Sequence, residues 1–156
     1  MSRKFKCIFD TNIFNRILDQ KIPDEAFGLQ VSAYVTHVQR DEINNTRNDE
    51  RREALANKFR DLIPDNGNII PTRSAVWGVS KWGQSMWTED DLCMELKLEL
   101  DKKNKRKKNN IEDALIADTA IKGKYVLVTE DGDLKEVTEL YGGKCWTLNE
   151  MLEQTS

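Results

Sequence analysis

Short apolar runs alternate with longer segments of helical periodicity along most of the chain. Each run is built from aliphatic, aromatic or β-branched residues and is bounded by polar or turn-forming residues, which is the pattern of a buried strand. Strands are predicted at residues 5–9, 34–36, 68–70, 125–129 and 144–147. The fourth is predicted to be a buried strand, and Val126, Leu127 and Val128 are consecutive in it.

Segments with helical spacing of apolar residues lie between the predicted strands. Helices are predicted after Asp10, over 38–62 as one long charged helix, and over 89–100, 111–122 and 132–142, with a short one at the C-terminus. The helix over 111–122 shows an amphipathic pattern and is expected to stop at Gly123. This alternation predicts an α/β domain. Its central sheet is expected to be mainly parallel, to have about four to five strands and to be covered by helices on both faces.

A chain of 156 residues is long enough for one domain with a sizeable core, so residues 1–156 are expected to form a single unit. Two stretches interrupt the alternation. A Trp-rich insert at about 71–88 holds Trp77, Trp82 and Trp87, whose separation of five residues fits one face of neither a helix nor a strand. A basic loop is expected at 102–110.

The composition indicates in which cellular compartment the protein is expected. Hydrophobic residues make up 38% and charged residues 33%, a polar balance, but the apolar runs argue against disorder. No stretch approaches the ~18–20 apolar residues that a membrane span needs, and the basic start is followed by too short an apolar run for a signal peptide. The three cysteines, Cys7, Cys93 and Cys145, form no Cys-x-x-Cys pair. Reduced thiols and a cytoplasmic location are therefore expected.

Four acidic side chains fall where ligands bind in a parallel α/β sheet, at the carboxyl ends of the strands. Asp10 directly follows the first predicted strand, and Asp131 follows the fourth by two residues. Glu42 lies about one turn into the helix after the second strand. Asp113 opens a crossover helix, which runs antiparallel to the strands, so its N-terminus returns to the same edge. All four are expected to converge on one rim of the sheet.

Carboxylates that are crowded together repel one another unless a cation compensates them. Their hard oxygen atoms suit Mg²⁺ or Mn²⁺, whereas a zinc site or a histidine base is disfavoured because His37 is the only histidine. Such a site lowers the pKa of a bound water and neutralises charge on a phosphate during in-line displacement. Taken singly, each carboxylate has a simpler interpretation as a helix cap or a solvated residue, so the prediction depends on their convergence.

Neighbouring acids are separated from the candidate ligands by helix geometry. Asp118 lies five residues after Asp113, which places it ~140° around the helix and ~7.5 Å along it. It is expected to face the side of the sheet or a partner. Glu112 is ~100° from Asp113 and is expected to be solvated. Asp133 is an additional candidate metal ligand at the rim, with a plain turn carboxylate as the alternative.

Four blocks, in chain order, resemble the signature of the PIN-domain family and together span nearly the whole chain. They are Phe9-Asp10-Thr11-Asn12-Ile13-Phe14, Thr36-His37-Val38-Gln39-Arg40-Asp41-Glu42-Ile43, Glu112-Asp113-Ala114-Leu115-Ile116-Ala117-Asp118-Thr119-Ala120 and Leu127-Val128-Thr129-Glu130-Asp131-Gly132-Asp133-Leu134. The first and the last two blocks are specific. The second is weaker, and Asp41 is an alternative to Glu42 there.

The resemblance implies an α/β/α sandwich that cleaves phosphodiester bonds, typically of RNA, with Mg²⁺ or Mn²⁺. The implied metal ligands and catalytic residues are Asp10, Glu42, Asp113 and Asp131. Asn12 and Thr129 would take supporting polar roles. Many small relatives are toxin ribonucleases of the VapC type that an antitoxin neutralises. The Trp-rich insert and the basic run depart from these compact toxins.

The basic run is the main candidate for contact with a nucleic acid, although the net charge of the chain is −3. Its cations are Lys102, Lys103, Lys105, Arg106, Lys107 and Lys108. The run ends five residues before Asp113, so it is expected near the acidic rim, where cations attract phosphates. A solvated loop is the simpler alternative. Expected partners are a nucleic acid, with RNA favoured, an antitoxin or regulatory protein, and a second copy of the chain.

Other functions make different demands on the sequence. A haloacid-dehalogenase-like phosphatase needs a second aspartate two residues after the first, where this chain has Asn12. A receiver domain needs paired acids near the first strand and a phosphoacceptor on a later one, which are not found. A nuclease of the same fold that cuts single-stranded or structured DNA remains an alternative. So does a non-catalytic nucleic-acid-binding or interaction module, although four central carboxylates would disfavour phosphate binding there.

Overall fold

Five parallel strands form one sheet in the computed structural model, which describes residues 4–27, 30–63, 66–72, 92–105 and 110–155. The strands are β1 (Phe5–Phe9), β2 (Val31–Thr36), β3 (Ile69–Ile70), β4 (Val126–Val128) and β5 (Lys144–Trp146), in the order β3-β2-β1-β4-β5. The predicted α/β class with a parallel central sheet is confirmed. Strands β1 and β4, which precede Asp10 and Asp131, are direct neighbours.

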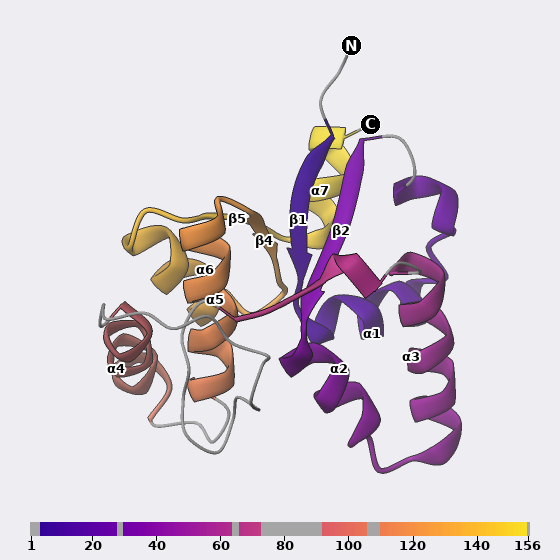
Figure 1. The fold of residues 1–156 in the computed structure, drawn as a ribbon, viewed down its shortest axis with the longest axis horizontal. Coiled ribbons are helices and arrows are strands. Elements are labelled where there is room, and N and C mark those ends of the chain that lie inside the picture. The colour runs from indigo at the N-terminus through magenta and orange to yellow at the C-terminus, as the bar shows by residue number, and fades with distance from the viewer. Residues whose placement is uncertain (1–3, 28–29, 64–65, 73–91, 106–109, 156) are drawn as a thin grey trace.

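Helices cover both faces of the sheet (Figure 1). They are α1 (Thr11–Gln20), α2 (His37–Asn44), α3 (Asp49–Leu62), α4 (Leu92–Asn104), α5 (Asn110–Gly123), α6 (Gly132–Leu140) and α7 (Leu148–Thr155), and short 3₁₀ turns occupy Asp24–Phe27 and Asn66–Asn68. Alternate residues of each strand pack into two separate hydrophobic cores, one on each face of the sheet. Phe9 and Val128 join α1, α3 and α7 on one face, whereas Ile8 and Leu127 join α4, α5 and α6 on the other.

The single helix predicted over 38–62 is wrong, because the chain forms two helices there. Helix α2 ends at Asn44, and α3 begins at Asp49. Asn48 caps α3, since its side-chain oxygen accepts a hydrogen bond from the Arg51 amide at 2.8 Å. Short polar side chains compete with the backbone for such hydrogen bonds, and this local effect interrupts a segment whose overall pattern is helical.

The amphipathic pattern predicted for α5 is also wrong. The helix packs against α4, α6 and β4, so its residues from Asp113 to Ala120 are all buried. Gly123 belongs to the helix, and the left-handed residue that ends it is Lys124, with φ of 59°. Glycine at 123 instead leaves room for the ring of Tyr125, with which a Cβ atom there would collide.

The basic loop predicted from residue 102 begins later than expected. Helix α4 continues to Asn104, so Lys102 and Lys103 lie on its last turn. The remaining cations of the run at 106–108, and the part of the Trp-rich insert at 73–88, lie outside the described residues.

The described parts of the chain contain no helix with the length and apolar character that a bilayer crossing requires. The three cysteines are buried and are not joined by a disulfide. Burial raises the pKa of the Cys7 and Cys145 thiols to about 12. At neutral pH both are therefore protonated and poor nucleophiles.

Candidate active site

The carboxyl ends of β1 and β4 place Asp10 and Thr129 side by side. Phe9 pairs with Val128 in the parallel register, and the Asp10 amide donates to the Val128 carbonyl at 2.9 Å. Asp10 is 6% exposed and Thr129 is fully buried. The expected convergence of the first and fourth strands at one rim is thus visible in the backbone itself.

The hydroxyl group of Thr129 is the centre of a hydrogen-bond network at this rim. It donates to Asp10 Oδ2 at 2.7 Å and accepts from Asn12 Nδ2 at 3.2 Å and from the Asp131 amide at 3.1 Å. The Asn12 side-chain oxygen accepts from the Glu130 amide at 3.2 Å, which fixes the orientation of the Asn12 amide. The hydroxyl therefore makes the three hydrogen bonds that it can make.

Asp10 and Asp131 are both N-cap residues. Asp10 Oδ1 accepts from the Thr11 amide at 2.8 Å, at the start of α1. Asp131 Oδ1 accepts from the amides of Asp133 and Leu134 at 3.0 and 3.2 Å, at the start of α6. Backbone amides and the helix dipole stabilise negative charge at such positions. The simpler interpretation of these two aspartates, as caps, is thus correct and does not exclude a further role.

Glu42 lies on α2, and a residue that the sequence analysis missed holds this helix against β1. Gln39 is fully buried. Its Nε2 donates to the carbonyl of Phe9 at 3.0 Å, and its Oε1 accepts from the Thr36 amide at 2.9 Å. The available signal was the Thr-x-x-Gln spacing of a capping box. Through Gln39, the helix that carries Glu42 is attached to the residue directly before Asp10.

The two aspartates of α5 have different surroundings. Asp113 lies in the first turn and is 4% exposed. Asp118 is fully buried and forms an ion pair with Lys122 at 2.9 Å, one turn later. The expectation that Asp118 lies deeper is consistent with this burial. Glu112 is half-buried, which differs from the solvated position expected for it.

No protein-family model matches the chain, and no curated protein matches it in sequence. Among solved structures, it is similar to VapBC2 from Rickettsia felis, bound to a DNA fragment from its promoter, with a TM-score of 0.51 and 17% identity over 92% of this chain and 98% of that one. The chain has a PIN-like α/β fold. At this low sequence identity, the similarity shows the fold alone.

Two further solved structures match at lower scores. VapBC-1 from nontypeable Haemophilus influenzae gives a TM-score of 0.48 at 16% identity, covering 92% of this chain and 98% of that one. FitAcB from Neisseria gonorrhoeae gives 0.46 at 14% identity, covering 90% and 96%.

The PIN-like fold brings two of the four predicted ligands into one hydrogen-bond network, that of Asp10 and Asp131. Within the described ranges, no three His, Cys, Asp or Glu side chains form a group that could hold a metal ion. Glu42 is half-buried on α2 and Asp113 is buried on α5. The donor chemistry fits a hard cation, because all four candidates offer carboxylate oxygens. The rest of the coordination sphere would have to form on binding.

Three lysines of the basic run lie within the described residues, and two of them form ion pairs. Lys102 pairs with Glu99 at 3.1 Å, and Lys103 pairs with Glu136 of α6 at 3.0 Å. Lys105 is exposed, with a left-handed φ of 57°. Of these three lysines, Lys105 is therefore the best placed to attract a phosphate.

Proposed function

We propose that the chain is a metal-dependent endonuclease that hydrolyses phosphodiester bonds of RNA. The metal ligands would be Asp10, Glu42, Asp113 and Asp131, with Asp133 as an additional candidate. The observation that carries this proposal is the Thr129 hydroxyl, which holds Asp10 and orients Asp131 at the ends of adjacent central strands. Such an arrangement at the rim of a PIN-like fold presents two carboxylates where substrates reach a parallel sheet.

Bound Mg²⁺ or Mn²⁺ would lower the pKa of a water molecule and neutralise charge on the scissile phosphate. The residues of the chain prepare the site for this chemistry. Amides at the starts of α1 and α6 orient the two aspartates, and the Thr129 hydroxyl, itself hydrogen-bonded by Asn12, restricts the rotation of Asp10. Ile13 and Leu134, in the first turns of these two helices, are fully buried in the hydrophobic cores.

RNA is proposed over DNA because the sequence resembles VapC-type toxin ribonucleases. The same resemblance supports a protein partner that inhibits the enzyme, and the structure from R. felis is named as a VapBC2 complex. A DNA nuclease of the same fold is the competing activity. A module that binds nucleic acid without cutting it is the competing function of another class.

Metal dependence gives the first test. With labelled single-stranded RNA and DNA, Mn²⁺ should permit internal cleavage and excess EDTA should abolish it. The far-ultraviolet circular dichroism spectrum should stay unchanged in EDTA, because the described fold has its own core. Calorimetry should detect Mn²⁺ binding to the wild-type protein and much weaker binding to Asp10→Asn. Full cleavage in thorough chelation would contradict the mechanism, and tight RNA binding without cleavage would favour the non-catalytic module.

The basic run gives the second test. Exchange of Lys105, Arg106, Lys107 and Lys108 for glutamine should weaken RNA binding and reduce its dependence on salt, because fewer counterions are released. The single-turnover rate at saturating RNA should change little. Lys97→Gln is a suitable control, since Lys97 lies on the same helix as Lys102 and pairs with Asp101 at 2.8 Å. Equal salt dependence in the quadruple variant and the wild type would identify the run as a solvated loop.

A further inference from the structure

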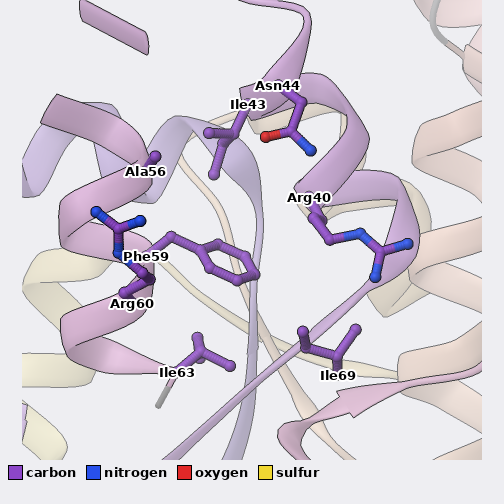
Figure 2. A pocket seen from close by; sticks show the side chains of 8 residues that line it. All are labelled: Arg40, Ile43, Asn44, Ala56, Phe59, Arg60, Ile63 and Ile69. Atoms are coloured by element: carbon purple, nitrogen blue, oxygen red, sulfur yellow. The ribbon is translucent and has the colours of Figure 1, made fainter. Parts of the chain in front are cut away.

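A pocket of about 510 Å³ lies between α2, α3 and β3 (Figure 2). Its lining residues are Arg40, Ile43, Asn44, Ala56, Phe59, Arg60, Ile63 and Ile69. Figure 2 shows the Phe59 ring near the centre, with Arg40 on α2 and Arg60 on α3 at opposite sides. The volume falls within the range of small-molecule sites, and a mainly apolar lining with a few polar groups is typical of them.

The register of the sheet places this pocket beside the proposed active site. Ile8 of β1 pairs with Tyr34 of β2, and the next residue, Val35, pairs with Ile69 of β3. Ile69 therefore lies at about the level of Phe9, directly before Asp10. Two strand spacings, roughly 10 Å, separate β3 from β1. A strand of nucleic acid with its scissile bond at Asp10 could reach the pocket with a flanking nucleotide.

The positive charges around the pocket favour an anionic ligand. Two of its lining residues are arginines, and none of the described residues that line it is acidic. Arg40 Nε lies 3.8 Å from Asp41 Oδ1, and both side chains are about one-third exposed. An ion pair of this kind is weak, so the Arg40 guanidinium keeps its capacity for a phosphate. Arg60 hydrogen-bonds the side chain of Asn57, a neutral partner that does not offset the charge of the guanidinium group.

We propose that this pocket binds one unpaired base of the substrate, with flanking phosphates on Arg40 and Arg60. This inference rests on the proposed nuclease function and extends it to the class of substrate. The apolar floor made by Ile43, Phe59 and Ile63 suits the face of a base, and the guanidinium groups suit phosphate oxygens. A base can enter a pocket only when it is not paired in a duplex. The substrate is therefore single-stranded at the nucleotide that enters.

Binding measured in EDTA separates this inference from catalysis. The probe is a short, fluorescently labelled single-stranded RNA, compared with the same strand in a duplex. Arg40→Gln and Arg60→Gln should each weaken single-strand binding about tenfold, and each should lower the slope of log K against log salt by roughly 0.7. Arg47→Gln removes the same charge from the exposed connection between α2 and α3 and should leave both quantities close to wild type.

A second pair of variants tests the base without changing charge. Ala56→Leu fills the pocket from α3 and should weaken single-strand binding about tenfold, the loss of one stacked base, with an unchanged salt slope. Ala54→Leu adds the same atoms to α3 outside the pocket lining and is the control. Thermal melting confirms that all variants are folded.

Two results would overturn the base pocket. One is equal RNA binding by Ala56→Leu and Ala54→Leu, which would make an apolar side chain of a protein partner the next occupant to test. The other is an equal effect of the arginine variants on duplex and single strand. Failure of the nuclease is distinguishable from both, because it would leave pocket-dependent binding intact while Mn²⁺ gave no cleavage.

Discussion

Single-turnover cleavage at saturating Mn²⁺ should fall by a factor on the order of 10³ in Asp10→Asn, Asp113→Asn and Asp131→Asn, because each change removes one ligand of a shared site. Glu42→Gln should show a comparable loss. Combined changes should lower the rate little further, since the first one already dismantles the unit. Asp10→Asn should remain folded, because asparagine is as good an N-cap as aspartate.

Neighbouring acids provide the controls for this series. Asp118→Asn should retain most of its activity per folded molecule, but it should lower the free energy of unfolding because Lys122 loses its buried counter-charge. Glu112→Gln should also stay active, and Asp133→Asn should fall between the two groups. If Asp118→Asn were as inactive as Asp113→Asn, the assignment on α5 would be wrong. An active Glu42→Gln beside an inactive Asp41→Asn would move the ligand on α2 by one residue.

Thr129→Val should lower the free energy of unfolding by about 3 kcal/mol, although valine has nearly the shape of threonine. The substitution removes the hydroxyl group that hydrogen-bonds Asp10 Oδ2, Asn12 Nδ2 and the Asp131 amide. These buried or part-buried polar atoms would be left with fewer hydrogen bonds, and unsatisfied groups cost more than a hydrogen bond contributes. Urea denaturation of the apo protein measures the change, and Thr129→Ser should recover much of it.

Thr138→Val is the matched control for this prediction. Thr138 is fully buried like Thr129, but its hydroxyl donates only within α6, to the Leu134 carbonyl at 2.7 Å. That carbonyl also accepts a backbone hydrogen bond within the helix. Removal of the Thr138 hydroxyl should therefore lower the free energy of unfolding by about 1 kcal/mol or less. Similar losses in the two valine variants would show that the Thr129 network contributes no more than an ordinary buried hydroxyl.

The sequence predicted the elements whose signals are local. Apolar runs located all five strands, and a parallel α/β arrangement followed from their alternation with helices. Asp10 and Asp131, predicted at strand ends on one rim, follow the paired strands β1 and β4. The shape of the network between them was not predictable in detail, because the Asn12–Thr129 hydrogen bond joins residues that are 117 positions apart.

The errors arose where tertiary packing or a single cap outweighed the pattern. The polar residues Asp113, Asp118 and Thr119 made α5 look amphipathic, yet the described structure buries all three by packing the helix between other elements. Asn48 divided a region that was helical by periodicity, through one hydrogen bond. Gln39 escaped notice because its importance depends on the carbonyl of Phe9, which is distant in sequence.

The long separation between Asp10 and Thr129 has a consequence for the time at which the site forms in a cell. Their hydrogen bond spans 119 positions, and β1 cannot pair on this side until β4 has been made. Because translation proceeds from the N-terminus, a nascent chain that has not reached residue 126 contains Asp10 without the hydroxyl that orients it. It also lacks Asp131. The rim is completed only after residue 131 has been added, so nascent chains shorter than that do not carry the assembled site.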